Sequence, residues 1–167
     1  SAIINSYGAD TARWFMLSDS PPERDLEWTE NGIAGSFKLI NKIWKITYDV
    51  IHNFENQNNN NNSDKELEYI TNKTVINITN NIDNIQFNKA IANIYELINS
   101  IQKFYVNKTA SKETFTKTLK QLALLLQPFV PHLSEEMWLS LGGHGLAINQ
   151  PWPEKKEITK KTSYNIA

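Results

Sequence analysis

The sequence contains no cysteine, few glycines and prolines, and no long apolar run. Without cysteine, it can form no disulfide, bind no zinc through thiolates and use no thiol nucleophile, and it suits a reducing compartment. No apolar run approaches the roughly 20 residues of a membrane-spanning helix. The 17 basic and 18 acidic residues leave a net charge of -1, so any contact with nucleic-acid phosphates has to come from a local basic patch.

Glycine and proline are the strongest helix breakers, and each occurs only 6 times. Neither of them occurs between Gly35 and Pro128, which favours long helices through the middle of the chain. The 167 residues are 40% apolar, enough for one domain with a substantial core.

Apolar residues recur through this middle stretch at steps of three and four, the spacing of a buried helix face. We predict that the first helix is capped by Thr29 and that the second begins at a capping box formed by Ser63 and Glu66. A short last helix is predicted over residues 131–141, ended by Gly142. The four apolar stripes are Ile33, Phe37, Ile40, Trp44, Thr47, Ile51 and Phe54; Leu67, Ile70, Thr74, Ile78 and Ile82; Phe87, Ile91, Ile94, Ile98, Ile101 and Tyr105; and Phe115, Leu119, Leu122 and Leu126.

These elements predict an all-α protein, folded as an up-and-down helical bundle with short or polar connections. The many Ile and Thr residues argue against helices, but the periodicity outweighs their propensity. Ahead of the bundle, Asp10 is the predicted N-cap of a shorter helix that ends before Pro21 and Pro22. Residues 142–167 show no sustained period and are predicted to form an extended tail anchored by Trp152.

Two enzyme-like patterns are weak. His132, Glu135 and Glu136 have the spacing of metal ligands on a helix, but a stable zinc site needs three or four protein ligands, and His144 lies beyond a glycine break. We therefore predict no metal site. Glu135 and Glu136 point to different sides of the helix, so they cannot act as a pair of catalytic carboxylates.

Lys38, Lys42 and Lys45 form a positive stripe along the first long helix. Such a stripe is usually a solvated helix surface, but it could also contact nucleic-acid phosphates. Exposed tryptophans could add base stacking, although an aromatic residue at helical spacing is more often part of a core. The tryptophans in question are Trp28, Trp44, Trp138 and Trp152, of which Trp44 and Trp138 are assigned to packing.

Several segments resemble class I aminoacyl-tRNA synthetases beyond their catalytic core. In chain order they are YGADTARWFML, SPPERDLEW, ENGIAGSFKLINKIWK, PFVPHLSEEMW and QPWPE. The segment PFVPHLSEEMW is shared by the leucyl, valyl, isoleucyl and methionyl members, whereas SPPERDLEW followed by a glycine-containing helix start is similar to the leucyl-tRNA synthetase family.

The resemblance implies three regions: the end of a stem-contact segment with a linker (1–28), the helical anticodon-binding domain (29–141) and the tail (142–167). It places the ATP and Mg²⁺ sites of the parent enzyme outside this chain, because the HIGH and KMSKS motifs are absent. We expect no catalytic residue and no cofactor in this part. The implied partners are tRNA(Leu) and the remainder of the synthetase chain, in a cytoplasmic monomer with no membrane contact.

The resemblance also implies that tRNA is held through its phosphates and sugars, which position it without reading sequence. Lys38, Lys42 and Lys45 are the candidate tRNA contacts, with Arg13 and Arg24 as weaker candidates at the junction. The same domain of a valyl- or isoleucyl-tRNA synthetase, or a helical protein-interaction module, remains an alternative. Pro21 and Pro22 would fix the direction in which the chain enters the bundle. Leu26 and Trp28 would dock there, and Trp28 would be largely buried.

Overall fold

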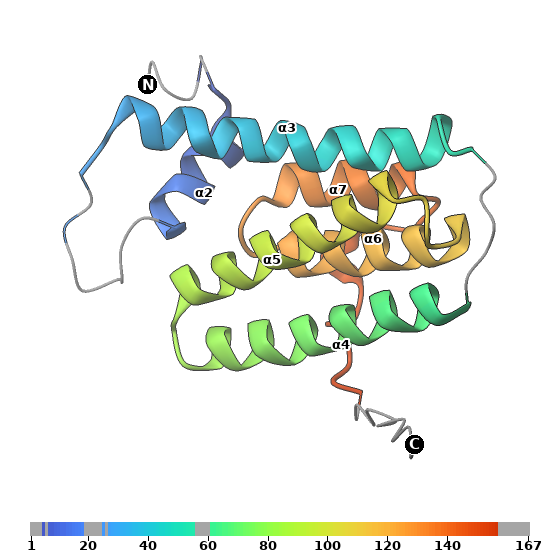
Figure 1. Ribbon diagram of the computed structural model, residues 1–167. Helices are drawn as coiled ribbons and strands as arrows, with labels where there is room; N and C mark the ends of the chain where they lie inside the picture. Colours follow the sequence, from blue (N-terminus) through green and yellow to red (C-terminus); the bar gives the residue numbers. More distant parts are fainter. Residues whose placement is uncertain (1–4, 6, 19–24, 26, 56–60, 157–167) are drawn as a thin grey trace, which may run out of the picture.

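The computed structural model describes residues 5, 7–18, 25, 27–55 and 61–156. Consecutive helices from α3 to α7 alternate in direction, which confirms the all-α, up-and-down bundle (Figure 1). No helix in these residues is both long and apolar enough to cross a membrane. The elements are α2 (Ala9–Ser18), α3 (Glu30–His52), α4 (Asn61–Asp83), α5 (Phe87–Val106), α6 (Lys112–Leu126), α7 (Pro131–Ser140) and the short 3-10 helix η1 (Ala147–Asn149).

The predicted start of α3 is confirmed. The Thr29 hydroxyl accepts a hydrogen bond from the Gly32 N–H at 3.2 Å, as an N-cap does. Gly32 is needed at this point because a Cβ there would lie 2.4 Å from the Phe15 ring of α2. The first turn of α3 can therefore pack directly on α2.

The predicted buried face of α3 is right only in part: Ile33 and Thr47 are buried as predicted, but the centre of the buried face is shifted by about one residue. Phe37 is 38% exposed, and Ile40 and Trp44 are only partly buried at the edge of the core. The chain has two adjacent apolar rows on this helix, and packing against the neighbouring helices selects the aliphatic one. That buried row consists of Ile33, Ser36, Leu39, Ile43, Ile46, Thr47 and Val50.

The predicted start of α4 is also wrong. The helix begins at Asn61, so Ser63 is an internal, buried residue and not the N-cap of a capping box with Glu66. The Asp64 carboxylate instead accepts the backbone N–H of Ser111 at 2.7 Å, ahead of α6. This bond joins the first turn of α4 to the start of α6.

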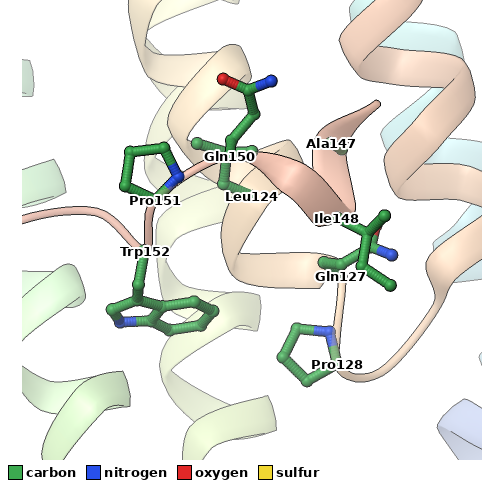
Figure 2. Close-up of a pocket in the computed structure, with 8 residues that line it drawn as sticks. All are labelled: Leu124, Gln127, Pro128, Ala147, Ile148, Gln150, Pro151 and Trp152. Atoms are coloured by element: carbon green, nitrogen blue, oxygen red, sulfur yellow. The ribbon is translucent and has the colours of Figure 1, made fainter. Parts of the chain in front are cut away.

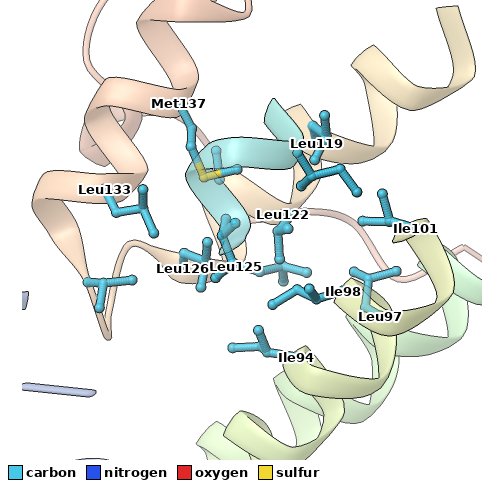
Figure 3. Packing of buried hydrophobic residues seen from close by; sticks show 14 of the residues in the cluster. Ile94, Leu97, Ile98, Ile101, Leu119, Leu122, Leu125, Leu126, Leu133 and Met137 are labelled. Atoms are coloured by element: carbon cyan, nitrogen blue, oxygen red, sulfur yellow. The ribbon is translucent and has the colours of Figure 1, made fainter. Parts of the chain in front are cut away.

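The core takes residues from all the helices from α2 to α7, and Figure 3 shows the part to which α5, α6 and α7 contribute. The predicted stripe of α6 is confirmed in full, since Phe115, Leu119, Leu122 and Leu126 are all completely buried. Leu133 and Met137 close this cluster from α7. α7 runs nearly as predicted and is followed by Gly142, whose positive φ of 81° is readily accessible only to glycine.

Helix α2 is part of the same core. Trp14 is fully buried, with its ring centroid 5.9 Å from that of Tyr95 and 6.2 Å from that of Phe129. Asp10 lies inside the first turn of α2 and does not cap it, so that prediction is wrong. Its carboxylate accepts the Leu133 N–H at 2.8 Å and so caps α7 instead, which lacks a side-chain cap of its own.

Trp28 is not largely buried, contrary to the prediction. Its side chain is 47% exposed and stacks on Phe15 of α2, with the ring centroids 5.2 Å apart. The predicted roles of Pro21, Pro22 and Leu26 lie outside the described residues.

The tail crosses the bundle after η1 and reaches α4, as Figure 1 shows. Trp152 donates its indole N–H to the Thr79 hydroxyl at 2.9 Å, which confirms the predicted tryptophan anchor. Residues beyond 156 lie outside the described part.

Candidate nucleic-acid interface

The three predicted lysines of α3 lie on one side of the helix, away from its buried row. Lys38 and Lys45 are exposed, and Lys42 is partly buried. The ammonium of Lys42 donates to the side-chain carbonyl of Asn99 on α5 at 3.1 Å. This bond leaves the positive charge of Lys42 uncompensated, because the amide oxygen of Asn99 is neutral.

Lys45 is different because it already has a counterion. Its ammonium lies 2.6 Å from the Asp49 carboxylate one turn later, and its side chain is 76% exposed. The hydrogen bond from Lys45 lowers the pKa of Asp49, so the carboxylate stays ionised at neutral pH. The same bond raises the pKa of Lys45, so both groups are charged at neutral pH.

A groove runs between α3 and α5 beside these lysines. Its cavity is about 220 Å³ and is lined by Lys42, Lys45, Ile46, Asp49, Gln102, Tyr105 and Val106. Burial raises the pKa of Tyr105, and the nearby Asp49 adds to the effect, so its phenol is neutral and can donate a hydrogen bond. The groove thus combines the uncompensated ammonium of Lys42 and the Lys45–Asp49 ion pair with neutral donors, a set with a net positive charge that suits a sugar–phosphate backbone.

The sequence did not predict Gln102, Tyr105 or Asp49 as part of this site. Gln102 and Tyr105 come from α5, far from the lysines in sequence, so no local pattern places them in the groove. Asp49 did carry a signal, because a carboxylate four residues after a lysine on a helix is a standard ion-pair spacing.

The two arginine candidates do not join the groove in the described structure. Arg13 lies on α2 and does not line the groove; its guanidinium is 3.0 Å from the Asp10 carboxylate. Arg24 lies outside the described residues.

The residues of the metal alternative have other contacts. The His132 ring is 3.8 Å from the Asp10 carboxylate, and the Glu135 carboxylate accepts the backbone N–H groups of Ala147 and Ile148 at 2.8 and 3.0 Å. Glu135 therefore caps η1. Across the part of the chain that the structure describes, no group of three His, Cys, Asp or Glu side chains could hold a metal ion.

The predicted packing of Trp44 and Trp138 is confirmed, since both are partly buried against the core. The Trp138 indole N–H also donates to the His144 carbonyl at 3.3 Å. Stacking on a nucleic-acid base therefore stays open only for Trp28 and Trp152.

Comparison with known proteins gives consistent matches. A family model described as the anticodon-binding domain of tRNA ligase matches residues 64–167. The leucine–tRNA ligase of Dinoroseobacter shibae is 41% identical over 155 residues, which are 92% of this chain and 17% of that protein. The leucine–tRNA ligase of Rhizorhabdus wittichii is 43% identical over 151 residues, which are 90% of this chain and 17% of that protein.

A solved structure shares the fold. It is the ternary complex of the agnB2 LeuRS of Agrobacterium radiobacter K84 with tRNA and LeuAMS, and it matches with a TM-score of 0.79 at 23% identity. The match covers 91% of this chain and 20% of that one. The chain thus spans about a fifth or less of the length of the proteins that it matches.

Proposed function

This chain belongs to the family of anticodon-binding domains of tRNA ligases, and we propose that it holds tRNA by its backbone at the lysine side of α3. The observation that carries the proposal is the α3–α5 groove, where Lys42 and Lys45 meet the neutral donors Gln102 and Tyr105. Positive charges beside uncharged donors bind phosphates and sugars and fix the position of the nucleic acid.

The predicted resemblance to leucyl-tRNA synthetases is confirmed by relatives at about 40% identity over nearly all of the chain. We propose that the whole protein is a leucine–tRNA ligase that uses ATP and Mg²⁺ to join leucine to tRNA(Leu). Within it, this domain orients the tRNA so that its acceptor end reaches a catalytic site in another part of the polypeptide. A valyl or isoleucyl enzyme is not favoured, because the relatives described above are leucine–tRNA ligases.

We also propose that the protein is cytoplasmic and monomeric. The absence of cysteine supports the first point, because it favours a reducing compartment. The rival from another class is a helical module that binds only proteins. Such a module should show no salt-sensitive binding of tRNA, whereas phosphate contacts make binding fall steeply with salt.

Replacing Lys38, Lys42 and Lys45 together with alanine should weaken the binding of tRNA(Leu). Each lost phosphate contact reduces the slope of log K against log salt by about 0.9. Because Lys45 is already paired with Asp49, Lys38 and Lys42 account for most of the loss, and the slope should fall by roughly 2. Fluorescence anisotropy of labelled tRNA at several salt concentrations measures both quantities. The matched control replaces Lys65, Lys73 and Lys89 with alanine. These lysines are exposed and lie on other helices, so the control changes the net charge by the same amount. Equal losses in the two variants would remove the α3 lysines from the proposal.

Replacing Asp49 with asparagine should strengthen tRNA binding. The substitution frees Lys45 from its 2.6 Å ion pair and removes a negative charge from the groove. We expect the salt slope to steepen by up to about 0.9, the value for one more phosphate contact. Glu113→Gln is the matched control, because it frees Lys117 from an equivalent pair on α6. A gain that persists when Lys45 is also replaced by alanine would show that Lys45 is not the contact.

A further inference from the structure

Trp152 stands between two hollows at the place where the tail crosses α4. A cavity of about 140 Å³ is lined by Trp152, Pro128, Gln127 and Ile148, among others, as Figure 2 shows. A second cavity of about 260 Å³ is lined by Trp152, Pro128, Thr79, Ile82 and Asp83. The hydrogen bond from the indole N–H to Thr79 holds the ring in place between them.

These hollows have the size and walls to receive a flat ring. A cavity of roughly 150 Å³ is enough to bind benzene, so the larger one has room for a bicyclic ring. The indole of Trp152 supplies an aromatic wall, and aromatic side chains are the surfaces on which unpaired bases stack. An open aromatic wall of this kind suits a planar ligand better than a bulky one.

Two acceptors at the hollows have no hydrogen-bond donor among the described residues: the buried side-chain oxygen of Gln127 and the exposed carboxylate of Asp83. The Asp83 carboxylate makes no hydrogen bond or ion pair with any residue that the structure describes. The side-chain oxygen of Gln127 is buried and likewise lacks a partner within the described residues. An apolar side chain that filled the larger hollow would cover the Asp83 carboxylate without offering it a hydrogen bond, which is costly. A ligand that fits must bring N–H donors on a flat ring.

A positive charge of the tail, Lys155, lies beside the same stretch of α4. Lys155 donates to the side-chain oxygen of Asn80 at 2.8 Å, and Asn80 directly follows the Thr79 that holds Trp152. Because the amide is neutral, the ammonium charge of Lys155 remains available to a phosphate.

We propose that Trp152, Asp83 and Lys155 bind one unpaired nucleotide, with guanine preferred. The base stacks on the Trp152 indole, its donor edge faces the Asp83 carboxylate, and its phosphate pairs with Lys155. Guanine fits best because its N1–H and exocyclic N–H groups are neighbouring donors, whereas each of the other bases pairs a donor with an acceptor on this edge. That the nucleotide belongs to a tRNA rests on the proposed function; the site itself does not.

The test uses free nucleotides, so it does not depend on tRNA binding. The chain carries 5 tryptophans, and the indole N–H signal of Trp152 in a nitrogen-15 correlation spectrum is identified by its loss in Trp152→Phe. Titration with GMP at millimolar concentrations should shift this signal and saturate, with an affinity about tenfold or more above that for UMP. Asp83→Asn should abolish most of the preference for GMP. Lys155→Ala should weaken all nucleotides alike, whereas Lys73→Ala, an exposed lysine elsewhere on α4, should not.

Two results would overturn the site. One is a Trp152 signal that no nucleotide shifts, and the other is a GMP shift that is unchanged in Asp83→Asn. If N-acetyl-leucine amide shifts the signal as strongly as GMP, the hollows serve an apolar protein segment and the nucleotide proposal is wrong. Saturable GMP binding in a chain that fails to bind tRNA would refute the proposed function and leave the site standing.

Discussion

Replacing Trp14 with alanine should lower the free energy of unfolding by about 3 to 5 kcal/mol, the usual range for removing a large aromatic side chain from a core. Trp14 is fully buried, and its indole packs in α2 against Tyr95 of α5 and Phe129 ahead of α7. No residue nearby can fill the space, because these neighbours are themselves held in the bundle. Urea denaturation followed by circular dichroism measures the loss.

Trp14→Phe is the matched control. The Trp14 indole N–H has no hydrogen-bond partner among the described residues, so phenylalanine gives up no bond and keeps an aromatic ring in the core. It should lose at most about half as much stability as alanine. If the alanine variant unfolds at the same urea concentration as the parent chain, α2 is not docked on the bundle as the structure shows.

The position of α2 bears on how the domain works. Residues 1–28 are predicted to end another region and lead into the bundle, and that division stays a prediction. The structure shows that α2 shares the core of the bundle through Trp14, while Phe15 packs against the first turn of α3. Helix α2 is thus held against the bundle that carries the α3 lysines where we propose that tRNA binds.

The sequence predicted the buried faces of α5 and α6 better than that of α3. The stripes of α5 and α6 were right because the predicted rows lie on the broad faces that these two helices bury in the core. On α3 the apolar arc is wide enough for two rows. The row with Leu39 and Ile43 is buried in place of the row with Phe37 and Trp44 because of the way α2, α6 and α7 pack on α3. A local sequence pattern does not contain that packing.

The candidate site was predictable only in part, for a similar reason. The spacing of Lys38, Lys42 and Lys45 is enough to place them on one side of α3. It could not show that Tyr105 completes a groove with two of them, because that requires the packing of α5 beside α3. The sequence pattern also could not show that Trp152 lines two cavities. These cavities form only where the tail meets α4 and the end of α6.

Replacing Asp10 with alanine should lower the free energy of unfolding by about 2 to 3 kcal/mol. Its carboxylate accepts the Leu133 N–H from 123 residues further along the chain, and this bond is buried. Alanine would leave that N–H without a partner inside the protein, which costs about 1 to 3 kcal/mol, and would remove a negative charge from the N-terminus of α7. Urea denaturation measures the total loss.

Hydrogen exchange separates this cap from a general loss of stability. In Asp10→Ala, the Leu133 amide should exchange much faster than amides in the middle of α6, which report global unfolding. Asp10→Asn retains an acceptor oxygen without the charge, so it should restore most of the Leu133 protection. Unchanged protection of Leu133 in the alanine variant would mean that water or another group satisfies this N–H. Full protection in Asp10→Asn would instead show that the hydrogen bond, and not the charge, joins α2 to the start of α7.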